Sequence, residues 1–341
     1  MRKKELINRG ILLINKKEVK GFLDMEKTIN TVEKAYTDYF LGKTIQPPVV
    51  NLTIPDCEGE LDIKSAYSSD LELIGIKAAS GFYHNPIKFG ISSGTGIIVL
   101  MDGETGFALS VMDGSYITTV RTGAAGAVGA KYLARKNSQH VFILGAGSQG
   151  RIQLKGLQEV LPELQTVLIY DLNRDNMKRF IEEMSPQTGL KIEEAESIEE
   201  GARNADVIIT VTPSHSPQIK ASWIKKGAHV NAIGSDGPGK QELDPEIFKS
   251  ARVVVDCWNQ VKVIGECQHA IKAGYLKEDG SNIWAEIGEI TSGHKSGREN
   301  ENEITLFDAT GMAVLDVATA GLVYHSALDN HHDRYFQSLI D

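Results

Sequence analysis

The sequence has few cysteines and no arrangement of them that would build a disulfide framework or a zinc site. Cys57, Cys257 and Cys267 are the only three in 341 residues, and none belongs to a Cys-x-x-Cys pair. An odd and low count predicts reduced thiols, as in the cytoplasm. Cys257 and Cys267 lie near His269, but no four-ligand spacing accompanies them, so no metal site is expected.

Long apolar runs and an excess of basic residues are also missing. No stretch of 18 apolar residues occurs, and the charged start Met1-Arg2-Lys3-Lys4-Glu5 does not resemble a secretory signal. Lys and Arg number 36 against 45 Asp and Glu, a formal net charge of −9. Nucleic acids and anionic membranes attract basic surfaces, so neither is an expected partner. The composition, 41% hydrophobic and 24% charged, predicts a globular protein long enough for two domains.

The N-terminal third predicts an antiparallel sheet with a helix in front of it. Apolar residues from Ile29 to Tyr39 recur at steps of three and four, which is typical of a helix. The turn Asp102-Gly103-Glu104-Thr105-Gly106 suits a hairpin, because Asp-Gly supplies positive φ. The strands expected in this sheet are 11–14, 49–54, 61–66, 73–79, 96–101 and 107–111.

From residue 119 onward the pattern changes to alternating helices and strands. A small-residue helix is expected over 119–134. Short, continuous apolar runs joined by helical patterns indicate a parallel sheet that is covered on both faces. Its expected strands are 141–144, 167–170, 207–211, 230–233 and 253–256. Residues 304–327 read as one apolar helix. The fold class expected is therefore α/β, a Rossmann-type doubly wound sheet beside an α+β domain.

A glycine-rich loop follows the first strand of that sheet. Its residues are Gly145, Ala146, Gly147, Ser148, Gln149 and Gly150, in the pattern G-x-G-x-x-G between a strand and a helix. The first glycine permits the turn, the second lets a pyrophosphate approach the backbone, and the third packs the helix on the strand. The free N–H groups of the following helix favour the phosphates. This context predicts a nicotinamide dinucleotide site.

An acidic residue at the end of the next strand favours NAD over NADP. Asp171 lies 21 residues after Gly150, close to the spacing of the carboxylate that binds both ribose hydroxyls. A carboxylate there repels a 2′-phosphate. Arg174 is the opposing signal, since it would suit that phosphate, and capping of the next helix by Asp171 is the purely structural alternative.

Several motifs together resemble the ornithine cyclodeaminase/mu-crystallin family. Beside the glycine loop they are Gly75-Ile76-Lys77, Arg121-Thr122-Gly123-Ala124-Ala125, the long run 231–243 (Asn-Ala-Ile-Gly-Ser-Asp-Gly-Pro-Gly-Lys-Gln-Glu-Leu) and Thr305–Gly311. The resemblance spans nearly the whole chain. It implies a homodimer in which residues 1–120 with 312–341 form the substrate and dimerisation domain and residues 121–311 the NAD-binding domain. The residue patterns alone suggest the same division.

The resemblance also implies hydride chemistry at the α-carbon of an amino-acid or imino-acid substrate, with roles for individual residues. Lys77 and Arg121 match family residues that contact the substrate carboxylate, and Asp236 matches the catalytic aspartate that moves protons. Lys77 is also counted as catalytic. Thr122 matches a phosphate contact, and Thr212 and Ile233 complete the cofactor set. The structural alternatives are an outward-facing Lys77, a surface Arg121 and a turn-forming Asp236.

The chain departs from the family where an additional carboxylate-binding arginine often follows Pro47-Pro48. Val49-Val50-Asn51 stand there, and Lys64 is expected to replace that arginine or to meet a second acidic group on the substrate. An extra lysine would repel the side-chain cation of ornithine, although Asp62 lies near the place of an acidic group that receives it. Ser93 falls near a family threonine that touches substrate.

Three functions remain open from the sequence. The first is a net oxidoreductase, of the alanine dehydrogenase, ketimine reductase or imino-acid reductase type. The second is an ornithine cyclodeaminase, which forms proline and ammonia with no net redox change. The third is a weakly active NAD(P)H- or ligand-binding protein like mu-crystallin.

Overall fold

The computed structural model describes residues 10–82 and 84–336, which fall into two compact units. One unit joins residues 1–121 to residues 312–341, and the other comprises residues 122–311. Helix α5 (Gly114–Leu133) belongs partly to each. We refer to them as the sheet unit and the Rossmann unit.

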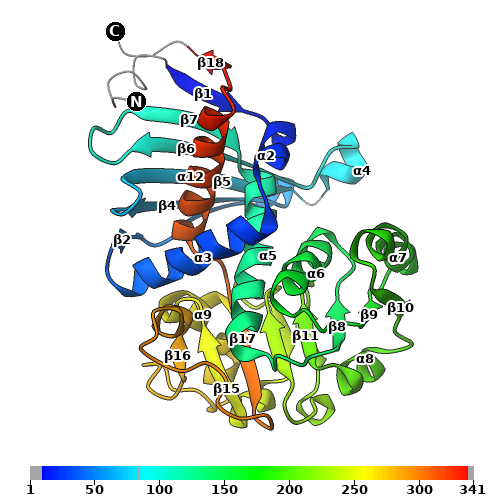
Figure 1. Ribbon diagram of the computed structural model, residues 1–341. Coiled ribbons are helices and arrows are strands. Elements are labelled where there is room, and N and C mark those ends of the chain that lie inside the picture. The colour runs from blue at the N-terminus through cyan, green and yellow to red at the C-terminus, as the bar shows by residue number, and fades with distance from the viewer. Residues whose placement is uncertain (1–9, 83, 337–341) are drawn as a thin grey trace. The chain divides into compact units, whose positions relative to one another are not determined.

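The sheet unit is built on eight strands in the order β18-β1-β7-β6-β5-β4-β2, with β3 also paired to β4 (Figure 1). Neighbouring strands are antiparallel except for β1 and β7, which are parallel. The strands are β1 (Ile11–Ile14), β2 (Thr44–Ile45), β3 (Val50–Ile54), β4 (Gly59–Ser68), β5 (Leu73–Phe82), β6 (Gly94–Asp102), β7 (Ala108–Asp113) and β18 (Tyr335–Phe336). The expected antiparallel sheet is therefore present, with one parallel pair.

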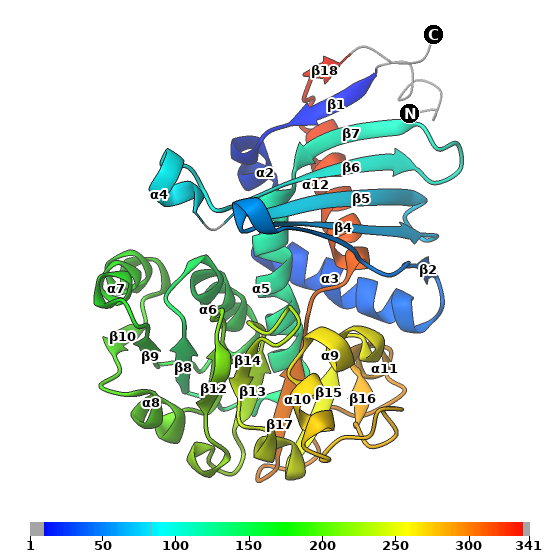
Figure 2. The same cartoon turned by 180° about the vertical axis from the view of Figure 1, so that it is seen from behind.

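One face of this sheet is covered by helices. The unit contains α2 (Lys16–Phe22), α3 (Met25–Phe40), α4 (Asn85–Phe89), α12 (Ala313–Asp329) and the short η1 (Pro55–Cys57). Helix α12 lies against β4, β5 and β6 and also packs on α3 (Figure 1). Gly75 permits this approach, because a Cβ on it would lie 2.6 Å from Cγ2 of Val317. In Figure 2 the opposite face of β4 to β7 is turned toward the viewer, with α12 behind it.

The Rossmann unit contains eight parallel strands in the order β10-β9-β8-β11-β13-β17-β15-β16. They are β8 (His140–Leu144), β9 (Thr166–Tyr170), β10 (Lys191–Glu194), β11 (Val207–Thr210), β13 (His229–Ala232), β15 (Ala251–Val255), β16 (Ala285–Glu286) and β17 (Ile304–Asp308). A small pair, β12 (His215–Ile219) and β14 (Gln241–Leu243), is separate. The strand order reverses between β8 and β11, where ligands bind in open sheets of this type.

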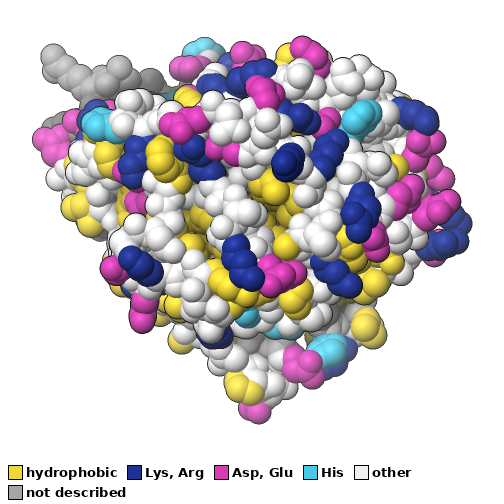
Figure 3. Space-filling view, turned by 90° about the horizontal axis from the view of Figure 1, so that it is seen from below, with side chains coloured by type: hydrophobic (Ala, Val, Ile, Leu, Met, Phe, Trp, Pro, Cys, Tyr) yellow, Lys and Arg dark blue, Asp and Glu magenta, His cyan; other side chains and the backbone are white. Residues whose placement is uncertain are grey.

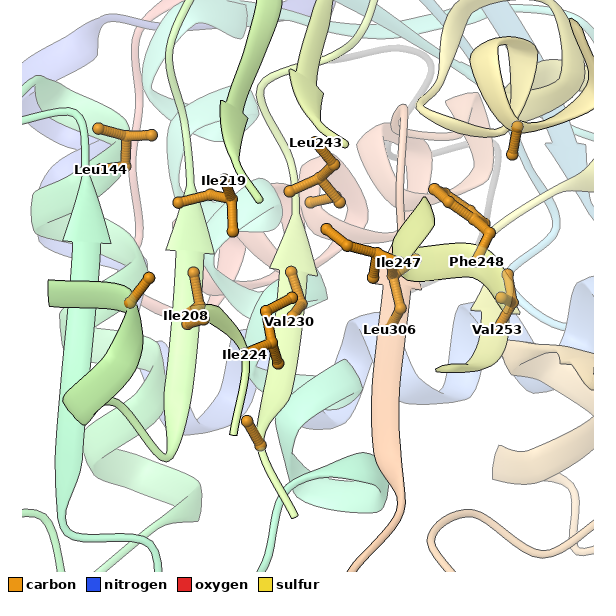
Figure 4. Packing of buried hydrophobic residues seen from close by; sticks show 14 of the residues in the cluster. Leu144, Ile208, Ile219, Ile224, Val230, Leu243, Ile247, Phe248, Val253 and Leu306 are labelled. Atoms are coloured by element: carbon orange, nitrogen blue, oxygen red, sulfur yellow. The ribbon is translucent and has the colours of Figure 1, made fainter. Parts of the chain in front are cut away.

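The helices of this unit pack on the sheet over apolar cores. They are α6 (Ser148–Val160), α7 (Arg174–Thr188), α8 (Ile198–Asn204), α9 (Trp258–Ile264), α10 (Cys267–Lys272) and α11 (Ile287–Thr291), with η2 (Ala221–Trp223) and η3 (Pro245–Lys249). Figure 4 shows one core, in which Ile208, Val230 and Leu306 project from neighbouring strands toward Ile224 and Ile247. The continuous Val/Ile runs thus form buried parallel strands, and the predicted α/β class is confirmed.

Two expectations about the helices were wrong. Residues 304–308 do not start the C-terminal helix; they form β17, which pairs with both β13 and β15 in the middle of the sheet, and the helix begins only at Ala313. Helix α5 begins at Gly114, five residues before the expected start. The Asp113 carboxylate accepts the Tyr116 N–H, which fixes this earlier start.

The surface carries mixed charges, and the three cysteines differ in their exposure. In the face drawn in Figure 3, basic and acidic side chains are interspersed rather than gathered by sign. Cys57 is exposed, whereas Cys257 and Cys267 are buried. Within residues 10–82 and 84–336, no helix is long and apolar enough to cross a bilayer.

Candidate active site

Four parallel strands of the Rossmann unit end together at one edge of the sheet. Leu144 of β8 lies in register with Tyr170 of β9 and Thr210 of β11, and Thr210 lies in register with Ala232 of β13. The residues that follow these strands include nearly all the expected cofactor contacts: Gly145 to Gly150, Asp171, Thr212 and Ile233. The structure therefore brings that set to the carboxyl edge of the sheet, at the reversal of strand order.

The three glycines of the loop differ in how much room each would leave for a side chain. Gly145 has φ of +116°, and a Cβ there would lie 2.9 Å from the Val211 carbonyl oxygen. A Cβ on Gly150 would lie 2.3 Å from the Gly145 carbonyl oxygen, so this position admits only glycine. Gly147 has φ of −84°, and a Cβ there would meet no atom within 4 Å. The fold therefore requires Gly145 and Gly150, whereas at Gly147 it leaves room above the backbone.

Gly147 is the N-cap of α6 and, lacking a side chain, cannot occupy the first-turn amides of that helix. An anion is the natural partner for such a helix end. The open space above Gly147 and these amides fit the pyrophosphate of a dinucleotide.

Asp171 is positioned beside the loop. Its Oδ2 accepts the Ala146 N–H at 2.9 Å, and its Oδ1 accepts the Asn173 N–H at 2.9 Å. The N-cap of α7 is Asn173, whose side chain accepts the Asp175 N–H. Capping of α7 is therefore not the reason for a carboxylate at position 171. Its contact with the loop puts the carboxylate where a ribose next to the pyrophosphate would meet it.

Asp236 lies in the loop after β13 and is exposed to solvent. Its side chain is 54% exposed, and its Oδ1 lies 2.5 Å from Nζ of Lys240. The loop is held at both ends, since the Ser235 hydroxyl donates to the Lys240 carbonyl and the Gly239 N–H donates to Gln268. Asp236 is thus an accessible carboxylate on an anchored loop, with a cation beside it.

A buried carboxylate that the sequence analysis did not single out supports this edge. Glu242 accepts the N–H and the hydroxyl of Thr212 with Oε1, at 2.6 and 2.7 Å, and the Gly234 N–H with Oε2, at 3.1 Å. It thereby ties the segment after β11 to the loop that carries Asp236. Burial raises the pKa of Glu242 to about 7, although the hydrogen bonds from Thr212 oppose this.

In the sheet unit, two residues that are expected to bind substrate, Lys77 and Arg121, both contact one buried carboxylate. Nζ of Lys77 (β5) lies 2.7 Å from Oδ2 of Asp316, and Nε of Arg121 (α5) donates to Oδ1 of Asp316 at 2.9 Å. Lys77 also donates to the Thr118 hydroxyl at 3.2 Å. The side chains of Lys77 and Asp316 are 3% and 2% exposed. Lys77 therefore does not face outward, and Arg121 is not a surface residue.

The electrostatics of this group are set by burial and by the neighbouring charges. Burial lowers the pKa of Lys77 to about 7; Asp316 opposes the shift, while Arg121 and Lys64 add to it. Burial alone would raise the pKa of Asp316, but the charges of Arg121, Lys77 and Lys64 outweigh it, and the pKa lies below its usual value. Asp316 is thus a carboxylate in this group, and Lys77 sits near its protonation midpoint at neutral pH.

Lys64 is opposite Lys77 in the sheet. The two lysines are direct cross-strand partners on β4 and β5, so their side chains leave the sheet on the same face. The structure thus brings Lys64, Lys77 and Arg121 to the α12 side of the sheet.

Ser93 does not join this group. Its carbonyl accepts the N–H of Phe82, five residues beyond Lys77 along β5, which corresponds to about 17 Å of strand. Thr122 follows Arg121 on α5, and its carbonyl accepts Nε2 of Gln153, a residue of the helix after the glycine loop. The roles proposed for Ser93 and Thr122 stay predictions.

Comparison with known proteins gives one consistent result. The family model for the ornithine cyclodeaminase/mu-crystallin family matches residues 11–331. The alanine dehydrogenase of Archaeoglobus fulgidus is 40% identical, over 94% of this chain and 96% of its own length. The Thermococcus litoralis Delta(1)-pyrroline-2-carboxylate reductase, solved with NADH and L-proline, has a TM-score of 0.90 at 36% identity, covering 94% and 98% of the two chains.

A third relative is the iminosuccinate reductase of Paracoccus denitrificans, solved with NAD⁺. It has a TM-score of 0.88 at 30% identity and covers 94% of this chain and 98% of its own. The matches extend over both units, and the resemblance seen in the motifs is confirmed. The chain belongs to the ornithine cyclodeaminase/mu-crystallin family.

Proposed function

We propose that this protein transfers hydride between NAD(H) and the α-carbon of a small amino or imino acid whose side chain carries no positive charge. The observation that carries the proposal is the buried group of Lys77 and Arg121, together with the open dinucleotide loop around Gly147. The protein is an NAD-dependent amino- or imino-acid enzyme, as are the dehydrogenase and the reductases it resembles.

In the oxidative direction the Cα–H bond breaks and its electron pair leaves as hydride, while the amine loses a proton and a C=N bond forms. Bound NAD⁺ supplies the nicotinamide that accepts the hydride. Lys77 and the planar fork of Arg121 bind the substrate carboxylate and orient the α-carbon. Asp236 takes up the proton of the amine, or returns it in the reductive direction.

The charges of the sheet unit favour a substrate with a neutral or acidic side chain. Lys64 and Lys77 are direct neighbours on one face, and Lys77 and Arg121 both contact the carboxylate of Asp316. A side-chain ammonium, as in ornithine, would add a further positive charge near these cations. Asp62 shares the face of Lys64, and its Oδ1 accepts Nδ2 of Asn51. We therefore place ornithine cyclodeamination second.

The cofactor is NAD. Asp171 faces the loop with a carboxylate, and structural relatives are complexed with NAD⁺ or NADH. Fluorescence titration is expected to give tighter binding of NADH than of NADPH; the reverse order would assign the site to NADP through Arg174.

A substrate panel tests the proposed reaction. L-alanine, L-proline, L-aspartate and L-ornithine are offered with NAD⁺, and pyruvate and oxaloacetate with ammonia and NADH. We expect net NADH formation or consumption with an uncharged or acidic substrate. Asp236→Asn is expected to bind NADH like the parent protein and to lose most turnover. Ornithine converted to proline and ammonia without net NADH would indicate the cyclodeaminase, and NADH binding without turnover on any substrate would indicate a binding protein.

We also propose a homodimer formed through the bare face of the sheet unit. Val50, Leu52 and Ile54 of β3, Ile76 of β5 and Ile97 of β6 share that face by strand register and are 37% to 55% exposed. A continuous apolar surface of this kind is typical of a protein interface. An archaeal alanine dehydrogenase of this fold was solved as a dimer with bound NAD, at a TM-score of 0.88 and 40% identity over 94% of this chain and 97% of that one. The cytoplasmic location stays a prediction.

A further inference from the structure

The anion between Lys77 and Arg121 comes from a helix on which none of the sequence motifs lies. Asp316 lies on α12, whereas Lys77 lies on β5 and Arg121 on α5. Each oxygen of its carboxylate contacts one cation: Oδ2 lies 2.7 Å from Nζ of Lys77, and Oδ1 lies 2.9 Å from Nε of Arg121. Asp316 therefore fixes the ends of two long side chains that come from different elements.

This arrangement leaves positive charge available. Lys77 and Arg121 both contact the carboxylate of Asp316, and the charge of Lys64 also acts on it. A second anion, such as a substrate carboxylate, completes the charge balance of this group.

We infer that Asp316 is the positioning residue of the substrate carboxylate site, holding Lys77 and Arg121 in place and favouring the charged form of Lys77. This inference rests on the proposed function. Asp316 touches the two binding residues rather than the substrate, so it acts through them. The groups facing Lys77 from the surrounding elements are Lys64 of β4, the apolar Ile98 of β6, Thr118 and Arg121 of α5, and Asp316 of α12.

The direction of the pH effect follows from these neighbours. Lys77 binds a carboxylate only in its charged form, so substrate affinity falls as the pH rises through the pKa of Lys77, which is about 7. Asp316 raises that pKa, whereas Arg121 and Lys64 lower it. In Asp316→Asn the alkaline limb of kcat/KM is therefore expected to move to lower pH by about one to three units. At neutral pH the KM for the acid substrate is expected to rise at least tenfold, with NADH affinity unchanged.

A matched control separates this effect from general loss of a buried ion pair. Asp206 in the Rossmann unit lies between Arg135 at 2.6 Å and Lys225 at 2.8 Å, and its side chain is 7% exposed. Asp206→Asn likewise removes a buried carboxylate charge from between two cations. In our proposal these residues do not contact the substrate. Asp206→Asn is expected to lower the melting temperature without moving the pH limb.

Asp316→Asn leaves two buried cations unpaired and can therefore fail to fold. A second variant is included for that case. Asp316→Glu keeps the charge but displaces the oxygens by one methylene. It is expected to leave the pH limb in place and to raise KM. A KM and pH limb equal to those of the parent protein in the folded Asp316 variant would overturn the inference.

The role of Asp316 can be tested even if the proposed function is wrong. If the parent protein turns over no acid of the panel, the proposed function fails, and the ionisation of Lys77 is then followed by NMR of protein labelled with [ε-¹³C]lysine. The Lys77 signal is identified by its loss in Lys77→Arg. A lower Lys77 pKa in Asp316→Asn than in the parent protein supports the control of Lys77 by Asp316, and an unchanged one overturns it.

Discussion

Buried charge occurs in two chemically different groups. In the sheet unit, Asp316 is compensated by Lys77 and Arg121. In the Rossmann unit, Glu242, Glu266 and Asp308 are all fully buried and receive hydrogen bonds chiefly from backbone N–H groups. Backbone amides stabilise a carboxylate less than a cation does, so burial dominates and raises the pKa of each, for Glu242 and Asp308 to about 7.

This difference predicts a pH-dependent stability at Asp308. Its pKa is raised to about 7 from an ordinary value of 3.8, so the native state retains a proton that the unfolded chain loses. The stability that this proton provides is complete below about pH 4 and is lost as the pH rises through 7. Asp308→Asn removes the ionisation but keeps an oxygen for the Cys267 N–H, which now donates to Oδ2. At pH 8 we expect the variant to be more stable than the parent by about 1–3 kcal/mol.

Urea unfolding at pH 5 and pH 8 measures this effect. The gain is expected to be smaller at pH 5 than at pH 8, because native Asp308 is protonated at pH 5 and only the ionisation of the unfolded chain contributes there. Asp56→Asn, at an exposed position, is the control and is expected to change stability little at either pH. A loss of stability at pH 8 in Asp308→Asn would show that the carboxylate form is the one the fold requires.

At the scale of the element, local pattern predicted most of the long strands and the glycine loop. It did not predict β10, β16 and β17 of the parallel sheet. The strands β5, β8 and β9 coincide with the apolar segments of the sequence, because short, continuous Val/Ile-rich segments between turns rarely form anything but strands. Ile304–Asp308 is equally apolar but lies only four residues from a long apolar helix, and the two patterns merge in the sequence. The β-branched Ile304 and Thr305, followed by Gly311, were the available signal.

Residues of the candidate site could be predicted where they belong to a short, continuous sequence motif. The glycine loop, Asp171, Lys77, Arg121 and Asp236 each sit in a short motif. Asp316 and Glu242 were not assigned, because their roles depend on contacts across the fold: Asp316 is 195 positions from Arg121 along the chain, and Glu242 is 30 from Thr212. A buried aspartate within the apolar run of α12 was the signal for the first.

The second and third glycines of the loop give contrasting predictions for α6 and its N-terminus. Gly147→Ala places a methyl group in open space at an ordinary φ of −84°, so we expect the melting temperature to stay nearly unchanged. The methyl group would occupy the approach to the helix amides, so the Kd for NADH is expected to rise at least tenfold. Calorimetric titration with NADH measures this.

Gly150→Ala is the contrasting variant of the same loop. Its Cβ would lie 2.3 Å from the Gly145 carbonyl oxygen, so α6 must shift and stability is expected to fall by about 1–3 kcal/mol. Unchanged NADH affinity in a folded Gly147→Ala protein would show that the pyrophosphate does not pass over this residue.

At the scale of the whole molecule, the two faces of the sheet unit carry different kinds of side chain. The face toward α12 carries Lys64 and Lys77, whereas the opposite face carries Leu52 and Ile97, which are 49% and 52% exposed. Alternation along each strand makes this separation possible, because residues two apart share a face. One sheet can therefore present a charged site on one side and an apolar association surface on the other.

The apolar face predicts that charge on it will separate the subunits. The parent protein is expected to sediment at twice the chain mass of 37.3 kDa. Ile97→Glu places a carboxylate within the proposed interface, where its desolvation opposes association, so we expect a shift to 37.3 kDa in sedimentation velocity at micromolar concentration. Val263→Lys, at a 55% exposed position on α9, is the matched control and should leave the mass unchanged. If Ile97→Glu sediments like the parent, the subunits associate through another surface; if the parent itself is a monomer, the apolar face has a different partner.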